Sequence, residues 1–235
     1  MKRLLLSGIL LLTIITPLMT ANAGINEGIA AYKIGDYKVA FQEMKVLAIN
    51  GRKFPQFILG MMFEHGKGVR KNYKEAFRWY HKSALQGYKP AQGILGTMFR
   101  DGIGVAKDFK QSIRWFYKAA VQGHVFSQVS LGVMYATGKG VTKDPREAVK
   151  WYHRAAVKGD AEAQGKLAMM FFDGSGITQS YKQAAEWFRM AAEQGHEFSQ
   201  LYLGGMYLEG KGVIKDNVRA YMWANISSSD GNKVA

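Results

Sequence analysis

The stretch FSQVSLGVMYATGKGVTKDPREAVKWYHRAAVKGDA, residues 126–161, decides the fold, because the chain repeats it with substitutions every 36 residues. The register is set by the tryptophans, which stand at Trp79, Trp115, Trp151, Trp187 and Trp223, each 36 residues after the last. Self-similarity at a fixed period of this length is typical of repeat architectures, in which each copy is one supersecondary unit. The sequence therefore predicts an internal repeat.

Each copy is predicted to begin with a helix. In the first copy Gln56, Leu59, Gly60 and Phe63 lie at positions i, i+3, i+4 and i+7, which share one helical face. A glycine at the centre of a helix lowers helix propensity, so Gly60 predicts the close approach of a neighbouring backbone. Gly66 follows and supplies the left-handed conformation that commonly ends a helix.

A second helix is announced by its cap. One position of the repeat carries good N-cap residues in every copy, namely Asn72, Asp108, Asp144, Ser180 and Asp216. Three residues later four copies carry a glutamate or glutamine that predicts a capping box: Glu75, Gln111, Glu147 and Gln183. Alanines and the tryptophan then recur at helical spacing, so this helix is expected to bury its tryptophan face.

Stacked antiparallel helix pairs predict an all-α protein with the architecture of an α-solenoid. The expected organisation is a secretory signal peptide at residues 1–23, a shortened capping copy at 24–53, and five copies over 54–235. These five copies span residues 54–89, 90–125, 126–161, 162–197 and 198–235, the last of them uncapped.

The recurring pattern, from Ser127-Gln128 through Leu131-Gly132 and Gly138-Lys139-Gly140-Val141 to Trp151-Tyr152, resembles the Sel-one-like repeat family, which is tetratricopeptide-like. The resemblance implies a right-handed superhelix of antiparallel helical hairpins. It also implies a scaffold for protein binding of the kind often found in exported bacterial proteins. It does not name the partner.

The first residues predict export. Lys2 and Arg3 precede an apolar run from Leu4 to Met19, and small residues up to Ala23 complete the order of a secretory signal peptide. The expected product is a periplasmic or secreted protein that is not an integral membrane protein. An uncleaved anchor is the alternative for this segment. The chain has no cysteine, so no disulfide stabilises it.

The formal net charge is +14, and it falls to +12 when Lys2 and Arg3 are removed. In a cytosolic chain such a charge would suggest nucleic acid. Export argues against that partner and favours an acidic protein surface or an anionic cell-envelope component. The other interpretation is a basic surface that keeps the protein soluble.

The sequence gives no sign of a metal site, a phosphate site or a catalytic site. The histidines lack ligand spacing, so no metal is predicted, and the Gly-x-Gly loops read as turns rather than phosphate sites. Cysteine-rich members of the resembled family have been described as β-lactamases, but the strings of a serine acyl enzyme do not occur here. The sequence therefore predicts no enzyme and no cofactor. A β-lactamase or cell-wall hydrolase is kept as the alternative.

Candidate partner-binding positions are those that vary between copies on the first helices, which by the resemblance line the concave surface. They are Phe57, Met61, Glu64, Thr97, Arg100, Val129, Val133, Met169, Phe172, Leu201 and Leu208. The alternative interpretation is that these side chains pad the next copy.

A second candidate is a basic edge formed by lysines that recur in the loop before the second helix. They are Lys71, Lys107, Lys143 and Lys215. The leading function is thus a non-enzymatic scaffold that binds a protein or peptide. A binder of an anionic polymer is the rival, and the uncovered face of the last copy suggests self-association.

Overall fold

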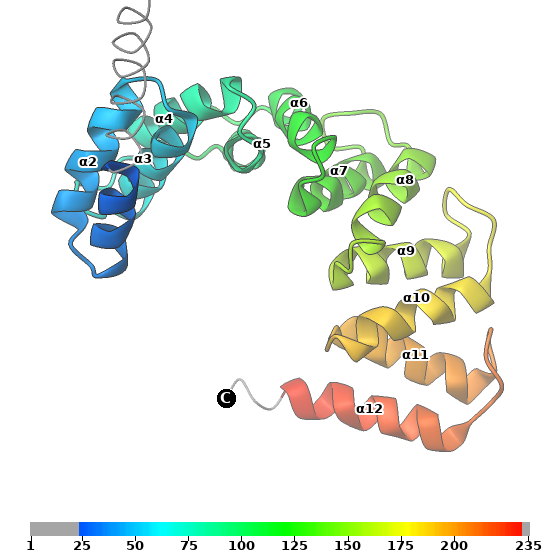
Figure 1. The fold of residues 1–235 in the computed structure, drawn as a ribbon. Helices are drawn as coiled ribbons and strands as arrows, with labels where there is room; N and C mark the ends of the chain where they lie inside the picture. The colour runs from blue at the N-terminus through cyan, green and yellow to red at the C-terminus, as the bar shows by residue number, and fades with distance from the viewer. Residues whose placement is uncertain (1–23, 232–235) are drawn as a thin grey trace, which may run out of the picture. The chain divides into compact units, whose positions relative to one another are not determined.

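The computed structural model describes residues 24–231, so the predicted signal peptide lies outside the described residues. Within that range the chain is all helix and turn, with no strand. Residues 24–33 are helical, and eleven helices follow (Figure 1): α2 Tyr37–Ile49, α3 Lys53–His65, α4 Tyr73–Leu85, α5 Lys89–Asp101, α6 Phe109–Ala120, α7 Val125–Thr137, α8 Pro145–Ala156, α9 Ala161–Asp173, α10 Tyr181–Glu193, α11 Glu197–Glu209 and α12 Asn217–Gly231. No helix in this range is long and apolar enough to cross a membrane.

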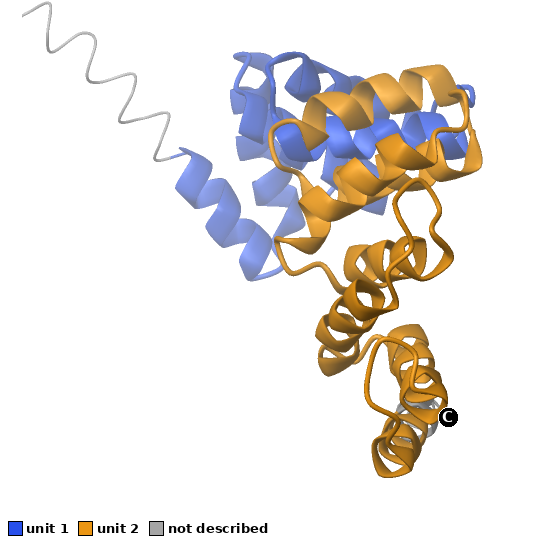
Figure 2. Cartoon of the chain, turned by 90° about the vertical axis from the view of Figure 1, so that its right-hand side faces the viewer, with its two compact units in different colours: residues 1–108 blue, residues 109–235 orange. Residues whose placement is uncertain are grey.

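Two compact units divide the chain, residues 1–108 and residues 109–235 (Figure 2). In the first unit α3 packs against α4, and in the second α7 packs against α8, α9 against α10 and α11 against α12. Each second helix also packs against the first helix that follows it within the unit, as α10 does against α11. The predicted all-α repeat solenoid is confirmed.

The first glycine of each loop ends a first helix in the left-handed conformation, as predicted. Its φ lies between 69° and 76° at Gly66, Gly102, Gly138, Gly174 and Gly210. Any other L-residue would be strained at this φ, so the loop requires glycine here.

The second glycine of each loop locks neighbouring copies together. A Cβ built on Gly140 would lie 2.5 Å from the Cβ of Phe109, at the start of the second helix of the preceding copy. A Cβ on Gly176 or Gly212 would overlap with the backbone of Pro145 or Tyr181 in the same way. The loop can approach the preceding helix this closely only without a side chain.

The glutamine that opens each copy caps the helix before it. The Nε2 group of Gln128 donates to the carbonyl of Ala120 at 2.9 Å, and that of Gln164 donates to the carbonyl of Ala156 at 3.1 Å. The equivalent bonds from the other copies join Gln56 to Ala48, Gln92 to Ala84 and Gln200 to Ala192. Each of these carbonyls also accepts from the amide of the glycine three residues later, as Ala120 does from Gly123 at 2.9 Å, so the glutamine adds a second bond at the helix C-terminus and ties it to the next copy.

The central glycine meets an aromatic ring and not a backbone at Gly60 and Gly132, so the prediction made for Gly60 was wrong. A Cβ on Gly60 would lie 2.7 Å from Cδ1 of Tyr80, and one on Gly132 would lie 2.5 Å from Cε1 of Tyr152. Both tyrosines are buried. The glycine makes room for a ring supplied by the second helix of its own hairpin.

The predicted N-caps are confirmed at Asn72, Asp144, Ser180 and Asp216, whereas the return bond expected of the capping box is replaced at Asn72. The side chain of Asn72 accepts from the amides of Lys74 and Glu75, and that of Asp144 accepts from the equivalent amides. The amide of Asn72 itself donates to the carbonyl of Phe63 at 2.8 Å, so the last turn of α3 takes the place of the glutamate. Glu75 pairs with Arg78 at 2.6 Å.

The tryptophans serve the core, as predicted, but unequally. Trp115 and Trp151 are buried, while Trp79, Trp187 and Trp223 are half-buried. A cation from the same helix covers the ring in three copies: Lys82 over Trp79, Lys118 over Trp115 and Arg154 over Trp151, at 4.3, 4.4 and 4.6 Å from the ring centre. The ladder is therefore structural.

Candidate functional site

The candidate residues Phe57 and Glu64 on α3 contact other residues of the first unit. The ring of Phe57 packs 5.7 Å from that of Tyr80 and 5.1 Å from that of Tyr88, which precedes the next first helix. Glu64 accepts a hydrogen bond of 2.5 Å from the hydroxyl of Tyr80. Burial, together with this carboxylate, raises the pKa of Tyr80 well above its ordinary value. Met61 is half-buried beside them.

On α5 the candidates also have partners of their own. Arg100 donates from Nε and Nη2 to the two carboxylate oxygens of Asp101, both at 2.8 Å. This hydrogen-bonded pair raises the pKa of Arg100 and lowers that of Asp101. The hydroxyl of Thr97 donates to the carbonyl of Gly93 at 3.4 Å. These polar groups are therefore satisfied without a ligand.

In the second unit the candidates differ in exposure. Val129 and Met169 are half-buried and pack against the core, and Val133 is exposed. Leu201 and Leu208, on α11, have 59% and 55% of their surface exposed. Among the apolar candidates of this unit, the two on α11 are therefore the most exposed.

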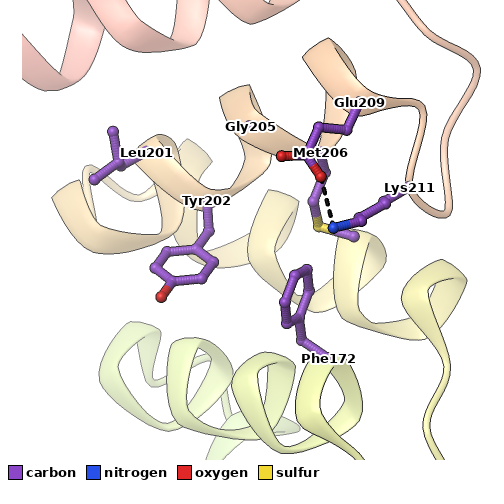
Figure 3. Close-up of a pocket in the computed structure, with 7 residues that line it drawn as sticks. All are labelled: Phe172, Leu201, Tyr202, Gly205, Met206, Glu209 and Lys211. Atoms are coloured by element: carbon purple, nitrogen blue, oxygen red, sulfur yellow. Dashed lines mark ion pairs between the residues drawn. The ribbon is translucent and has the colours of Figure 1, made fainter.

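Two of the predicted residues, Phe172 and Leu201, lie in one cavity of about 400 Å³ between α9 and α11. Figure 3 shows it with its seven lining residues: Phe172, Leu201, Tyr202, Gly205, Met206, Glu209 and Lys211. The lining is mainly apolar. A cavity of this size is at the small end of those that hold ligands or anchor side chains.

The cavity has an aromatic wall and a charged rim. The ring of Phe172 lies edge-on to that of Tyr202, 5.9 Å away. Lys211 reaches to 5.8 Å from the centre of the Phe172 ring and pairs with Glu209 at 2.6 Å. The hydrogen bond from Lys211 to Glu209 raises the pKa of this lysine. The site can thus combine apolar contact with recognition of a charge.

Gly205 opens this cavity. The same position of the repeat carries a side chain in the other copies, as at Met61, Val133 and Met169. No atom lies within 4 Å of a Cβ built on Gly205. The last first helix therefore exposes its own backbone to the cavity.

A second cavity, of about 420 Å³, lies on the other side of Gly205, between α11 and α12. Its lining has no charged side chain: Leu201, Gly204, Gly205, Leu208, Asn217, Ala220, Tyr221 and Ala224. Leu201 and Leu208 are thus brought together here, and Leu201 borders both cavities.

The predicted basic edge is exposed. Lys71 lies 4.7 Å from the centre of the Tyr73 ring, and Lys107 and Lys143 are exposed in their loops. Lys215 differs, because it lines a polar cavity of about 350 Å³ with Arg189 and Arg219. This is the one lysine of the predicted set that a described cavity includes.

The hydroxyl of Tyr207, which also lines that cavity, accepts hydrogen bonds from both arginines. Arg189 donates to the hydroxyl of Tyr207 at 3.0 Å and Arg219 at 3.4 Å, and Arg219 pairs with Asp216 at 3.3 Å. The bond to Tyr207 raises the pKa of Arg219. Three cations face one carboxylate here, which leaves the cavity positively charged.

In the described part of the chain no three His, Cys, Asp or Glu side chains are placed to hold a metal ion. His196 bonds to Ser199 at 2.7 Å and to Glu162 at 3.2 Å. His124 bonds to Ser127 at 2.8 Å. Both histidines hold the start of a first helix.

Sequence reasoning missed Tyr202, Gly205, Lys211 and Ala224. The sequence does show two of these positions as exceptions. Gly205 and Ala224 carry a smaller residue than the other copies do at the same repeat positions. Which cavity each loss opens depends on the packing of α9, α11 and α12, which the repeat pattern does not give.

Comparison with known proteins gives a family match. The Sel1 repeat model matches residues 56–88, 89–124, 125–160, 161–196 and 198–232. A comparison with curated proteins finds no match.

Solved structures with the same architecture are similar to this chain. The crystal structure of c5321, a protective antigen present in uropathogenic Escherichia coli strains and displaying an SLR fold, aligns with a TM-score of 0.87 and 33% identity. The alignment covers 90% of this chain and 46% of c5321, so the chain spans about half the length of that protein.

A Sel1 repeat protein from Oxalobacter formigenes aligns with a TM-score of 0.82 and 32% identity, over 86% of this chain and 83% of that one. A Sel1 repeat protein from Klebsiella pneumoniae, at 20% identity and a TM-score of 0.50, covers 83% of this chain and 94% of its own, and shares the fold alone.

Proposed function

The chain belongs to the Sel1 repeat family, and we propose that it is an exported, non-enzymatic scaffold that binds a protein or peptide through the first-helix face of its last copies. Sel1 repeat proteins are generally protein-interaction scaffolds. What is proposed for this chain is the export and the face that binds.

The cavity between α9 and α11 carries the proposal. Its aromatic wall, formed by Phe172 and Tyr202, suits a large apolar side chain of the partner. The bare backbone at Gly205 lets a partner chain lie close to α11. The pair of Glu209 and Lys211 at the rim can orient a polar or charged neighbour of that side chain.

Closing the cavity tests the proposal. The probe is a peptide selected against the purified protein from a phage-displayed random library, and its affinity is measured by calorimetry. Gly205→Met restores the side chain found at Met169, so we expect it to weaken binding by at least about tenfold. Val133→Met is the matched control, because it adds the same side chain at the same repeat position in α7.

A selected peptide that binds the Gly205→Met variant as tightly as the parent protein would contradict this site. So would selection that enriches no peptide.

Export rests on the order of charge, apolar run and small residues in the first 23 positions. We expect the protein recovered from the periplasm or medium of an exporting cell to begin at Gly24. Mass spectrometry and N-terminal sequencing of the recovered chain measure this. A full-length chain confined to the cytosol would contradict export.

A second candidate function is the binding of an anionic cell-envelope polymer at the basic edge. Its specific support is the cavity in which Lys215 joins Arg189 and Arg219. Binding of purified lipopolysaccharide should weaken steeply with added salt, since exposed charges are screened over about 8 Å at physiological ionic strength. Lys215→Gln should reduce it more than Lys166→Gln, which removes an exposed lysine from α9. Binding that ignores salt would remove this candidate.

A further inference from the structure

The second helix of the last hairpin lacks an aromatic ring that the other four copies carry at the same position. That position holds Tyr80, Phe116, Tyr152 and Phe188, all of them buried. The fifth copy has Ala224, which is exposed. The atom nearest to a Cβ built on Gly204 is a carbonyl oxygen at 3.3 Å, so no ring lies over this glycine.

This substitution opens the cavity of about 420 Å³ between α11 and α12. Gly204, Gly205 and Ala224 line it, together with the exposed side chains of Leu201 and Leu208. The volume is ample for an aromatic side chain, and apolar surface of this kind is stabilised when it is covered.

The preceding hairpin shows what covers such a face. On α9 and α10, the next first helix places the rings of Phe198 and Tyr202 at 6.4 and 5.3 Å from the ring of Phe188. That face receives a helix that carries aromatic side chains, and among residues 24–231 no helix covers the corresponding face of the last hairpin.

The helix beside the cavity carries an unpartnered apolar stripe. Val218, Tyr221 and Met222 lie at i, i+3 and i+4 of α12, with 80%, 70% and 44% of their surface exposed. Tyr221 also lines the cavity. The last hairpin thus presents an exposed ring and a cavity large enough for a ring on one face.

We propose that two copies of this chain pair through this face, with Tyr221 of each copy inserted over Ala224 of the other. A two-fold axis makes such an interface self-complementary, since one patch supplies both the ring and its receptor. The cavity has no charged lining residue, so the positive charge of the chain, +14, does not bring like charges together inside it.

Sedimentation velocity on the purified protein, over concentrations from about 1 to 100 μM, tests the pairing. We expect the mass to rise from one chain to two. Tyr221→Ala removes the ring, and Ala224→Phe fills the cavity from within, as Phe188 does one copy earlier. Each should raise the dissociation constant by at least about tenfold.

Mixing the two variants tests the geometry. The Ala224→Phe variant keeps its ring and the Tyr221→Ala variant keeps its cavity, so only a mixed pair can form one of the two contacts. We expect the mixture to associate more tightly than either variant alone. Val157→Ala, which trims an exposed side chain at the end of α8, is the control and should dimerise like the parent protein.

A single-chain mass at every concentration would overturn the proposal, as would growth beyond two chains or a mixture no tighter than its components. Circular dichroism checks that both variants keep their helix content. Neither variant alters a residue of the cavity between α9 and α11. Peptide binding there should persist in both, so the failure of one proposal is distinguishable from the failure of the other.

Discussion

The hairpins α7–α8 and α11–α12 have the same backbone devices and different interiors. Both end their first helix at a left-handed glycine, and both bond their opening glutamine to the helix before. In the first hairpin Tyr152 fills the space over Gly132, whereas in the second Ala224 leaves the space over Gly204 open. The hairpin is therefore shaped by its loop and glutamine bonds, and the ring decides whether its outer face is closed.

Removing the ring from the closed hairpin should have the largest effect. Tyr152→Ala deletes a buried ring, so we expect the free energy of unfolding to fall by about 3 kcal/mol. Urea titration followed by circular dichroism measures it. Tyr221→Ala, which trims the exposed tyrosine of the open hairpin, should change stability by less than about 0.5 kcal/mol in the monomer. Equal losses would show that the two hairpins are not different in this way.

The central glycines should respond unequally. Gly132→Ala forces a Cβ against the buried ring of Tyr152 and should cost about 1–3 kcal/mol. Gly204→Ala places a Cβ at 3.3 Å from the carbonyl oxygen of Ala220, which is a tight contact, but it gains helix propensity, so the net change in stability should be less than about 1 kcal/mol. Thermal and urea unfolding of both variants measures the two changes, and equal losses would contradict the expectation.

Alkaline pH should weaken the closed hairpin. Burial raises the pKa of Tyr152 above the ordinary tyrosine value of 10.0. Above that value the unfolded chain releases a proton that the folded chain keeps, so stability falls as pH rises, by up to about 1.4 kcal/mol per pH unit. Urea titrations at pH 9 and 11 measure the slope. Tyr152→Phe should reduce it, and an unchanged slope would contradict the assignment.

The shared glutamines should matter equally. Gln128→Met and Gln200→Met each remove one of the two donors to a helix-terminal carbonyl, at Ala120 and Ala192 respectively. We expect each to lose about 1 kcal/mol, with the two losses agreeing within about 0.5 kcal/mol. A much larger loss at Gln128 would mean that the two hairpins differ in their backbone devices as well.

The fold was predictable because its determinants are local. The glycine of each loop, the N-cap and the spacing of apolar residues act within one copy, and recurrence in register made them unmistakable. The partner of Gly60 was predicted wrongly, since the glycine pattern shows that something comes close without showing that it is the ring of Tyr80.

The candidate site was predictable only in part. Phe172 and Leu201 were found because they vary between copies, and they do share a cavity. Phe57 and Glu64 vary in the same way, yet Phe57 packs against the ring of Tyr80 and Glu64 accepts a hydrogen bond from its hydroxyl. Variation between copies therefore does not show whether a side chain is available to a partner. At Gly205 and Ala224 a side chain of the other copies is missing. Whether this leaves a cavity depends on which helices pack against these positions, and the repeat pattern does not give that packing.

The second glycine of each loop contacts the second helix of the preceding copy, so each copy stabilises the one before it. Through Gly212 at its start and Gln200 at its end, α10 is clamped by the copy that follows it, and α8 is clamped likewise through Gly176 and Gln164. Among the described residues α12 has no such clamp. Fraying should therefore start at α12 and travel toward the N-terminus of the second unit, so amide protons should exchange fastest there and progressively more slowly in α10 and α8.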